Sequence, residues 1–524
     1  MLTRAGPCLS SPTRLFCRFS HSLRQFQEDK RWPGWELVVG IEVHAQIKSR
    51  QKLFSDAWTS DPGGSPNIHV SPFDAAFPGT LPRLNEKCVA LAVRTAIALN
   101  SDVQTRSTFD RKHYFYSDLP AGYQITQRYD PIAKGGFLNL SQSGIAVRIE
   151  QIQLEQDTAK STSDPRRRES SIDLNRAGTG LLEVVSKPDM RSPEEAGDYV
   201  RNLQALLRAV GSSDGSMEKG SLRADVNVSI NRPGQPPGTR CEIKNLNSVK
   251  FLMIAITSEV FRHISILESG RAVPQETRGF NEDSGETFML RSKENAPDYR
   301  YMPDPNIPPL ILDKIYVQGI RDAMPELPHE TRSRLLWQGL SDRDIDVLTA
   351  VDSGRDVGFD GELGGGATLY FDALSKTHDP KTVVNWITHE LLGQLALRHI
   401  TFQQNPVSVD QMGDLIDLVQ SGELTGSSGK TLLRYMLDHP SDDRPRALAE
   451  RLDLLSLRQD GSLEALCHEA IQALPQEAEA VRKGNLNVLN KLVGRVMKSS
   501  RGTANAQATR AVLHTLLQPP HDLA

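Results

Sequence analysis

The fold of the first half of this chain is decided by the stretch Val38-Val39-Gly40-Ile41-Glu42-Val43-His44-Ala45-Gln46-Ile47. Successive side chains of a β-strand point to opposite faces, so this alternation predicts one apolar and one polar face. The apolar face carries Ile41, Val43, Ala45 and Ile47, and the polar face carries Glu42, His44 and Gln46. Residues two apart on a strand lie roughly 6 to 7 Å from each other. Glu42 and His44 can therefore share one metal or phosphate site, although a solvated outer face would show the same alternation.

Further segments along the chain repeat this pattern. Residues 147–157 and 223–230 alternate like strands, and Glu183 stands alone in the apolar run 181–185, where an unpaired carboxylate is costly. The polar faces of these segments and of the stretch 241–244 carry Gln151, Gln153, Glu155, Asp157, Arg223, Asp225, Asn227, Glu242 and Lys244. Capping signals between them predict helices over residues 86–99, 193–210 and 249–268.

Beyond Met324-Pro325-Glu326-Leu327-Pro328 the strand signals end, and apolar residues recur at the three-and-four spacing of helices. We therefore predict an α+β fold. Its parts are a cradle domain with a mixed or antiparallel sheet over residues 32–324, an all-helical domain over 325–405, and a small helical tail domain over 406–524. A chain of 524 residues is long enough for this number of domains.

The first 31 residues differ from the rest in composition. They are rich in arginine and serine, with apolar residues between them and no acidic residue before Glu28. This composition is typical of a mitochondrial transit peptide, so we predict import into the mitochondrial matrix and leave the segment out of the fold. A basic arm that stays attached is the alternative interpretation.

The overall composition excludes several classes of protein. With 38% hydrophobic residues, 24% charged residues and a formal net charge of -4, the chain does not have the composition of a strongly basic nucleic-acid binder. No apolar run approaches the roughly 18 to 20 residues that cross a bilayer, so we expect no membrane insertion. The five cysteines form no CxxC pair, which argues against a zinc knuckle.

The acidic residues of the predicted strands suggest the chemistry. One imidazole and several carboxylates suit Mg²⁺, which keeps waters and shares substrate phosphates, and such ions activate phosphoryl transfer. The set consists of Glu42, His44, Glu155, Asp157, Glu183, Asp225 and Glu242. Each residue taken alone is equally compatible with an acidic surface position.

Two common nucleotide or hydrolase signatures are missing. The stretch Gly426-Ser427-Ser428-Gly429-Lys430-Thr431 ends like a P-loop, but Leu424 stands where its first glycine should be. The chain also has no GxSxG elbow and no amidase-like serine signature. If the reaction consumes an amide donor, we expect a different chain to hydrolyse it.

Long ordered motifs in this sequence resemble the B subunits of glutamyl-tRNA(Gln) amidotransferase. The motifs that carry the resemblance are Gly40-Ile41-Glu42-Val43-His44, Lys52-Leu53-Phe54-Ser55, Arg111-Lys112-His113-Tyr114-Phe115-Tyr116, Asp173-Leu174-Asn175-Arg176, Pro188-Asp189-Met190-Arg191-Ser192-Pro193, Lys244-Asn245-Leu246-Asn247-Ser248 and Arg300-Tyr301-Met302-Pro303-Asp304-Pro305. The chain departs from the family pattern at Gln156, where many relatives carry a second acid, and also at Thr158, Ala159 and Gly180.

The resemblance implies a reaction, cofactors and partners. In this family the B subunit uses ATP and Mg²⁺ to phosphorylate the γ-carboxylate of glutamate on tRNA(Gln), and an amidase (A) subunit supplies the ammonia that then displaces phosphate. A small bridging third subunit and glutamyl-tRNA(Gln) are the other expected partners. The family's metal ligands fall on Glu42, His44, Glu155 and Glu183, and its catalytic set falls on Glu42, His44, Asp225 and Glu242.

Basic residues complete the predicted site. Near the phosphates we expect Arg223 or Lys244, which would offset the repulsion between ATP and the γ-carboxylate. Arg111 and Lys112, beside the aromatic residues 114–116, are expected to contact the tRNA acceptor end, although an aromatic core with surface charges is the alternative. In the tail, Lys483, Lys491, Lys498 and Arg501 recur through a segment expected to contact tRNA.

Two other functions stay open at this point. A small-molecule ligase resembling glutamine synthetase would need the same metals without a tRNA surface, and the long helical C-terminal region argues against it. A non-catalytic RNA-binding scaffold would not need so many carboxylates on one face.

Overall fold

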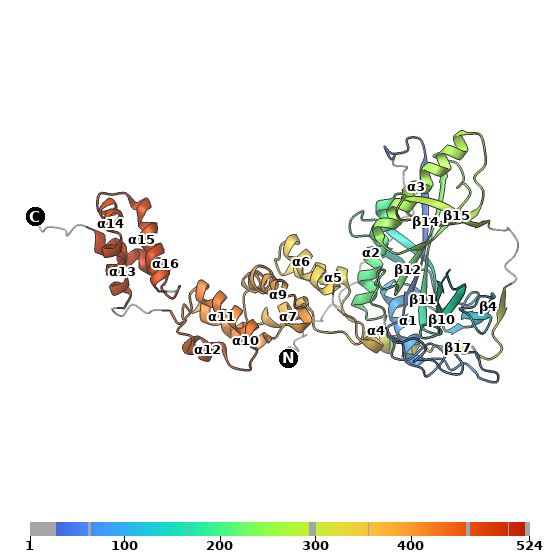
Figure 1. The fold of residues 1–524 in the computed structure, drawn as a ribbon, viewed down its shortest axis with the longest axis horizontal. Helices are drawn as coiled ribbons and strands as arrows, with labels where there is room; N and C mark the ends of the chain where they lie inside the picture. Colours follow the sequence, from blue (N-terminus) through green and yellow to red (C-terminus); the bar gives the residue numbers. More distant parts are fainter. Residues whose placement is uncertain are drawn as a thin grey trace, which may run out of the picture. The chain divides into compact units, whose positions relative to one another are not determined.

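A computed structural model describes residues 28–60, 64–164, 166–292, 300–354, 356–456, 462–500 and 502–518. The predicted transit segment therefore lies outside the described residues except for its last four positions, and Arg501 lies outside them as well. All described strands precede residue 312, and the elements after it are helices (Figure 1). The predicted α+β fold with a helical C-terminal region is confirmed.

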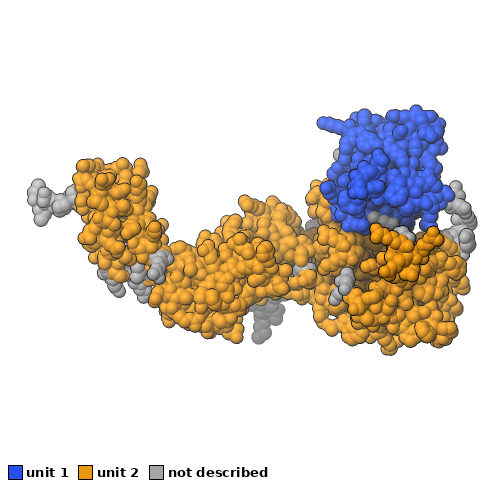
Figure 2. Space-filling model, viewed as in Figure 1, with its two compact units in different colours: residues 1–42, 187–197, 224–296 blue, residues 43–186, 198–223, 297–524 orange. Residues whose placement is uncertain are grey.

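The chain divides into two compact units, which Figure 2 shows in different colours. The first unit comprises residues 1–42, 187–197 and 224–296, and the second comprises residues 43–186, 198–223 and 297–524. The predicted domain ranges 32–324, 325–405 and 406–524 were drawn from changes in the sequence pattern. The division into two compact units does not test them, so they remain predictions.

In the first unit, five strands follow one another in the order β15-β14-β13-β12-β1. They are β1 (Glu36–Gln46, of which residues 36–42 belong to this unit), β12 (Leu222–Asn231), β13 (Cys241–Leu246), β14 (Glu276–Asn281) and β15 (Glu286–Ser292). Pairing is antiparallel between β12 and β13 and between β14 and β15, and parallel between β13 and β14. Ser248 caps helix α3 (Val249–Glu268), which contacts β13 and β15.

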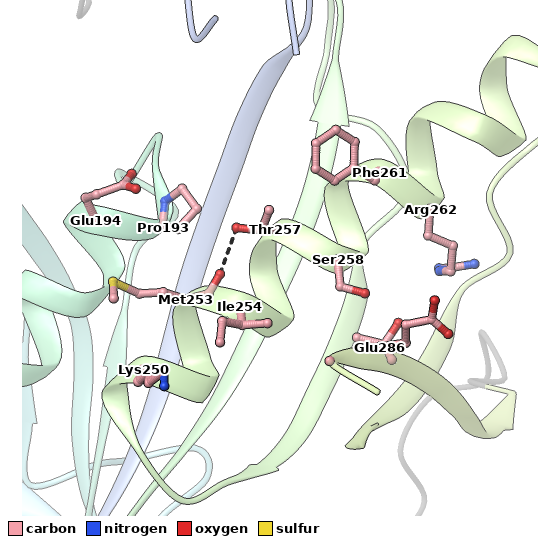
Figure 3. Close-up of a pocket in the computed structure, with 12 residues that line it drawn as sticks. Pro193, Glu194, Lys250, Met253, Ile254, Thr257, Ser258, Phe261, Arg262 and Glu286 are labelled. Carbon is pink, nitrogen blue, oxygen red and sulfur yellow. Dashed lines mark hydrogen bonds between the residues drawn. The ribbon is translucent and has the colours of Figure 1, made fainter. Parts of the chain in front are cut away.

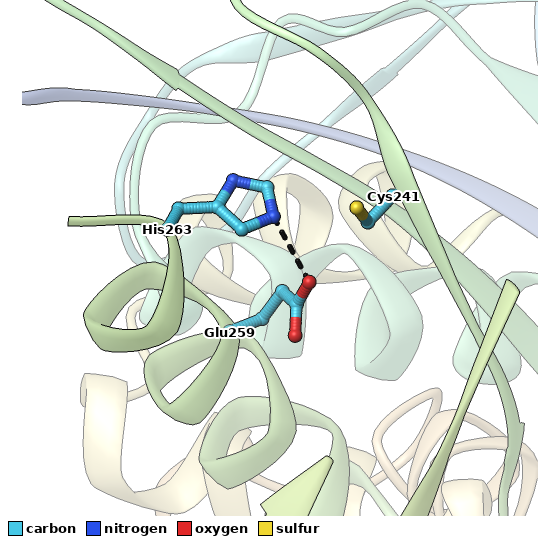
Figure 4. A group of neighbouring side chains, drawn as sticks. All are labelled: Cys241, Glu259 and His263. Atoms are coloured by element: carbon cyan, nitrogen blue, oxygen red, sulfur yellow. Dashed lines mark hydrogen bonds and ion pairs between the residues drawn. The ribbon is translucent and has the colours of Figure 1, made fainter. Parts of the chain in front are cut away.

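Beneath α3 lies a buried network of charged side chains. Glu259 of α3 accepts hydrogen bonds from His263 at 2.9 Å, from Arg262 at 2.6 Å and from Thr287 at 2.7 Å. Cys241 of β13 lies beside Glu259 and His263 (Figure 4). Burial would raise the pKa of Glu259, but the hydrogen bonds from His263 and Arg262 outweigh it and lower the pKa. We therefore interpret the network as an ionic core, in which the Nδ1 atom of His263 is buried without a hydrogen-bond partner among the described residues.

In the second unit, the strands follow the order β1-β11-β8-β6-β2, with residues 43–46 of β1 belonging to this unit and β7 also paired to β8. The strands are β8 (Ala146–Gln156), β11 (Gly180–Ser186), β6 (Ala133–Lys134), β2 (Asp102–Val103) and β7 (Phe137–Asn139). Asn85 caps α1 (Glu86–Ala98), which contacts β8. A separate three-stranded sheet has the order β16-β4-β5, formed by Tyr301–Pro303, Asp110–His113 and Tyr123–Thr126.

Short two-stranded pieces and helix α2 complete the sheet-containing part. The pieces pair β9 (Lys160–Asp164) with β10 (Glu169–Asp173), and β3 (Arg106–Ser107) with β17 (Leu310–Ile311). Helix α2 (Pro193–Ala209) begins after Ser192, whose hydroxyl accepts from the backbone N–H of Glu195. Gly211 follows α2 at φ +71°, as expected for a residue that ends a helix.

The helical region contains two hydrophobic cores. One is formed by residues between Leu335 and Leu454, and the other by residues between Leu463 and Leu517. The helices around the first core are α5 (Pro328–Trp337), α6 (Asp342–Ser353), α7 (Ala367–Leu374), α8 (Pro380–Asn385), α9 (Leu392–Leu397), α10 (Val409–Gln420), α11 (Gly426–Asp438) and α12 (Pro445–Arg451). A π-helix (Trp386–Leu391) joins α8 to α9, and α4 (Lys314–Asp322) precedes α5. Around the second core lie α13 (Ser462–Ala473), α14 (Pro475–Arg482), α15 (Leu489–Ser499) and α16 (Ala506–Leu517).

The described helices include none that is long and apolar enough to span a lipid bilayer. The stretch 426–431, which resembles the end of a P-loop, forms the first turns of α11. Thr425 caps this helix by accepting a hydrogen bond from the backbone N–H of Ser428. This capped helix agrees with the rejection of a P-loop from the sequence.

Candidate active site

The opening strand has the two faces that the sequence predicts. Ile41, Val43 and Ala45 are at most 1% exposed, whereas Glu42 and His44 are only half-buried. The strand thus directs its polar residues away from the core. Glu42 belongs to the first unit and His44 to the second, and each has partners within its own unit.

His44, Glu155 and Glu183 form the centre of the candidate site, which we call the ligand cluster. One ligand atom from each residue lies within 4.8 Å of the other two. The Nδ1 atom of His44 is 3.3 Å from a carboxylate oxygen of Glu155. The side chain of Glu155 is 1% exposed and that of His44 is 19% exposed, so the cluster is shielded on one side and reachable on the other.

The pairing of β8 with β11 brings the two carboxylates together. Glu183 lies directly opposite Gln153, and Leu181 lies opposite Glu155, so Glu155 and Glu183 are diagonal neighbours on one face. The amide of Gln153 donates a hydrogen bond to Glu183. This partner explains how a carboxylate is tolerated within the apolar run 181–185, a question that the sequence left open.

Lys112 of β4 supplies positive charge to the ligand cluster. Its Nζ atom lies 3.2 Å from Glu155. Burial alone would raise the pKa of Glu155, but the ammonium group of Lys112 and the imidazole of His44 lower it well below its usual range. The attraction of Glu155 also raises the pKa of Lys112. The carboxylate is therefore ionised and the lysine charged at neutral pH.

The donor set of the ligand cluster fits a magnesium ion. Two carboxylates suit Mg²⁺, which in proteins is commonly held by one or two carboxylates and keeps waters and phosphate oxygens as its other ligands. Asp157, which directly follows β8, is not one of these donors. Its carboxylate binds Arg223 at 2.8 Å and Gln46 at 3.0 Å instead.

In the first unit, Glu42 accepts a hydrogen bond of 3.0 Å from Asn227 of β12. Lys244 of β13 binds Asp225 at 2.6 Å and Glu242 at 3.2 Å. Burial would lower the pKa of Lys244, but these two carboxylates raise it. The four predicted residues Glu42, Asp225, Glu242 and Lys244 thus lie on the polar faces of three strands in this unit, with the lysine held as a cation.

The basic residues predicted to contact tRNA occupy two different settings. Arg111 binds the buried carboxylate of Asp304 at 2.8 Å and stacks on Tyr123, while Lys112 binds Glu155. The tail residues Lys483, Lys491 and Lys498 are exposed instead. Lys491 and Lys498 stand seven residues apart on α15 and so share one face of that helix. Their contacts with tRNA remain predictions.

A separate groove lies against α3 in the first unit (Figure 3). It has a volume of about 910 Å³ and is lined mainly by Met253, Ile254, Thr257 and Phe261 of the helix. None of the predicted catalytic or metal-binding residues lines it. Glu194 and Glu286 also line the groove, but neither belongs to a group of metal-binding side chains among the described residues, so the groove does not offer the chemistry of the ligand cluster.

Comparison with known families identifies the chain. The model of the GatB/GatE catalytic domain matches residues 37–318, more than half of the chain, and the model of the GatB domain matches residues 369–517. The chain belongs to the GatB family. This membership confirms the resemblance and places both the sheet-containing part and the helical part within the family pattern.

Relatives of this GatB chain are similar over nearly its whole length. The B subunit of mitochondrial glutamyl-tRNA(Gln) amidotransferase from Laccaria bicolor is 59% identical over 99% of this chain and 98% of its own length. The protein of the same name from Mycosarcoma maydis is 44% identical over 93% and 87%, respectively. The B subunit of the aspartyl/glutamyl-tRNA(Asn/Gln) amidotransferase from Methylorubrum populi is 45% identical over 91% of this chain and 95% of its own.

Sequence reasoning missed the residues that hold the site residues in place. Gln153, Asn227 and Asp157 each bind a predicted site residue, namely Glu183, Glu42 and Arg223. Alternation placed all three on polar faces but could not tell which strands are neighbours. Arg176 lies in a turn between strands, where no periodic pattern marks it.

Proposed function

We propose that this GatB-family chain activates the γ-carboxylate of glutamate esterified to tRNA(Gln) by ATP-dependent phosphorylation, so that ammonia can convert it to glutaminyl-tRNA(Gln). The single observation that carries this proposal is the ligand cluster, where two carboxylates and an imidazole converge beside a charged lysine. The named function of the relatives agrees with it.

The chemistry explains why such a site is needed. A carboxylate is a poor acceptor for ammonia, because it would have to expel oxide. Transfer of the terminal phosphoryl group of ATP to a γ-carboxylate oxygen releases ADP and forms an acyl phosphate. Attack of ammonia on the acyl carbon then breaks the bond to the phosphate-bearing oxygen, expels phosphate and leaves the amide. The first step brings together two anions, so positive charge must be provided.

Residues of the second unit are assigned to the metal ion. We assign His44, Glu155 and Glu183 as magnesium ligands. Glu42, the fourth ligand that the resemblance implies, belongs to the first unit and remains a prediction. Bound Mg²⁺ would neutralise phosphate charge and align donor with acceptor. Lys112 keeps Glu155 ionised and adds a positive charge beside the cluster. Arg223, held by Asp157, is assigned to the phosphates of ATP.

The residues of the first unit are assigned a supporting role. Asp225 and Glu242 hold the ammonium group of Lys244 in one position, and Asn227 holds Glu42. An ammonium group fixed by two carboxylates can approach a phosphate without a further loss of side-chain entropy. We therefore retain Asp225 and Glu242 as catalytic residues and Lys244 as an ATP-binding residue in the proposal.

Recognition of tRNA is assigned to two surfaces. Arg111 and Lys112 lie on β4, whose neighbouring loop carries the exposed rings of Phe115 and Tyr116. Exposed rings can stack on the unpaired bases of an acceptor end. The exposed lysines of α14–α16 and their connections are assigned to phosphates of the tRNA body.

Partners and location follow from the same proposal. The sequence offers no glutaminase nucleophile of the kinds considered, and ammonia is mostly protonated at neutral pH. An amidase subunit is therefore expected to supply it, with a small third subunit as a bridge. The basic N-terminal composition and the mitochondrial names of two fungal relatives support a transit peptide and a mitochondrial matrix location.

An assay of ADP formation tests the proposal. The chain, assembled with its amidase subunit, is given ATP and Mg²⁺ with and without glutamyl-tRNA(Gln), and the charged product is analysed. We expect ADP formation to depend on the misacylated tRNA and glutaminyl-tRNA(Gln) to appear when glutamine is added. Free glutamate serving equally well would favour a small-molecule ligase, and tRNA binding without any ADP formation would favour a scaffold.

A further inference from the structure

The carboxylate of Asp157 gathers two arginines from distant parts of the sequence. Its Oδ1 atom accepts from Nη2 of Arg223 at 2.8 Å, and its Oδ2 atom lies 3.5 Å from Nε of Arg176. Gln46 and the backbone N–H of Thr158 also donate to this carboxylate, at 3.0 and 2.9 Å. All these residues belong to the second unit. Asp157 itself is only 2% exposed, so its position is set by the fold.

Two guanidinium groups contact one carboxylate at this point, which brings them within a few ångströms of each other. Both arginine side chains remain 35% exposed. Two like charges held together in this way repel each other, and a second anion would relieve that repulsion. Guanidinium groups also match the oxygen geometry of phosphate.

The arginine pair lies beside the ligand cluster. Asp157 follows Glu155 by two residues and stands directly after the last residue of β8. Gln46, which contacts Asp157, follows His44 by two residues on β1. Two residues of extended chain span roughly 6 to 7 Å. A chain of phosphates that begins at the ligand cluster can therefore reach the arginines.

We propose that Arg176 and Arg223 together bind a phosphate group of ATP, with Asp157 as the residue that positions both. This inference rests on the proposed function and adds Arg176, which lies in the motif 173–176 but was given no role from the sequence. A phosphate of the tRNA backbone has the same chemistry and is the alternative source. The half-buried arginines and their place beside the ligand cluster favour the nucleotide.

Arg176 also contacts the backbone, so the test must distinguish a structural role from phosphate binding. Its Nε and Nη2 atoms donate to the backbone carbonyls of Thr158 and Ala159 at 2.9 and 3.0 Å. A purely structural arginine would hold this turn and nothing else. Arg191 offers a matched control, because it is similarly exposed (32%), binds one carboxylate (Glu36) and donates to two backbone carbonyls away from the ligand cluster.

The experiment compares Arg176→Gln, Arg223→Gln, the double variant and the control Arg191→Gln in the assembled enzyme. We measure the affinity for magnesium-bound AMPPNP, a non-hydrolysable ATP analogue, and separately the affinity for glutamyl-tRNA(Gln) without nucleotide. KM for ATP, kcat and melting temperature are recorded for each. Loss of a charge-assisted contact predicts that each single variant weakens AMPPNP binding roughly tenfold or more. Because both arginines bind one group, the double variant should lose less than the product of the two single losses.

The remaining outcomes each overturn the inference. Unchanged AMPPNP affinity with weaker tRNA binding would assign the pair to a tRNA phosphate. A lower melting temperature and lower kcat with unchanged AMPPNP affinity, as for Arg191→Gln, would leave Arg176 a structural residue. If the parent enzyme forms no ADP with glutamyl-tRNA(Gln), the proposed function fails on its own, independently of these variants.

Discussion

Two buried glutamates of this chain stay ionised because cationic or hydrogen-bonding side chains contact each of them. Glu155 and Glu259 are both buried, and both have a pKa below the usual range because cations or hydrogen-bond donors surround them. The first stands in the ligand cluster and the second in the core beneath α3. The sequence alone shows a glutamate at both positions, so only the surrounding residues distinguish the two roles. The core residue therefore provides a test of the electrostatic argument that does not involve catalysis.

Replacing Glu259 with Gln should destabilise the fold in a pH-dependent manner. At neutral pH the variant leaves Arg262 and Arg278 with weaker partners, and loss of one member of a buried ionic pair costs about 3 to 5 kcal/mol. Because the pKa of Glu259 is lowered on folding, its stabilisation is complete above the ordinary value of about 4.3 and is lost as the pH falls further. Melting curves from pH 8 to pH 3 should show the gap between parent and variant closing below about pH 4. A gap that is constant with pH would contradict this account.

Elements were predicted best where one periodic pattern runs without interruption. The strand 38–47, the helix 249–268 and the helix after Asn85 all form as expected, because alternation or capping fixes each one locally. Pairing between strands could not be predicted, since register depends on contacts far apart in sequence. Glu183 was recognised as anomalous, yet its partner Gln153 became visible only with β8 placed against β11.

The two faces of β1 should respond differently to substitution. Ile41 is 1% exposed, so Ile41→Ala should destabilise the fold by about 2 to 5 kcal/mol, and Ile41→Val by about 0.5 to 1.5 kcal/mol. Chemical denaturation monitored by circular dichroism measures both. The graded loss is the control, because it must follow the number of methyl groups removed. Equal stability of parent and Ile41→Ala would mean that this face does not lie in a packed core.

Helix α11 provides a prediction about a motif that resembles a nucleotide loop. Lys430 forms an ion pair with Glu390, and its stretch is helical from Gly426 onward. Lys430→Ala should therefore leave KM for ATP within about twofold, as expected for a surface substitution. Steady-state kinetics with varied ATP provide the measurement. A large rise in KM for ATP would show that the P-loop interpretation was rejected wrongly.

At the scale of the whole molecule, the sequence indicated the class, the change from sheet to helix and the family. The residues of the ligand cluster were also named from sequence. Alternation placed His44 and Glu155 on polar faces, Glu183 stands alone in an apolar run, and the resemblance implies all three as metal ligands. The holding residues Asp157 and Asn227 were not assigned their roles, because those roles arise only when strands meet. The helical region forms its second core from residues after Leu463, while residues 409–451 contribute helices to the first.

The exposed lysines of the second helical core should contribute to tRNA affinity. The double reversal Lys491→Glu with Lys498→Glu places two negative charges on one face of α15. We expect weaker binding of glutamyl-tRNA(Gln) and a salt dependence reduced by about one unit of slope per lost phosphate contact. Reversal of the exposed Lys376 and Lys381 gives the same change in net charge and serves as the control. Equal losses in both double variants would mean that only the overall charge matters.

The most direct test of the central claim replaces His44 with Ala in the assembled enzyme and follows three reactions. These are ADP formation with glutamyl-tRNA(Gln), glutaminyl-tRNA(Gln) formation, and glutamine hydrolysis by the partner subunit. The account predicts that the first two fall by roughly a hundredfold or more, because a ligand of the ligand cluster is lost. Glutamine hydrolysis should persist, since its nucleophile is expected on another chain. Normal rates of tRNA amidation with an unchanged Mg²⁺ dependence would contradict the assignment of the ligand cluster as the active site.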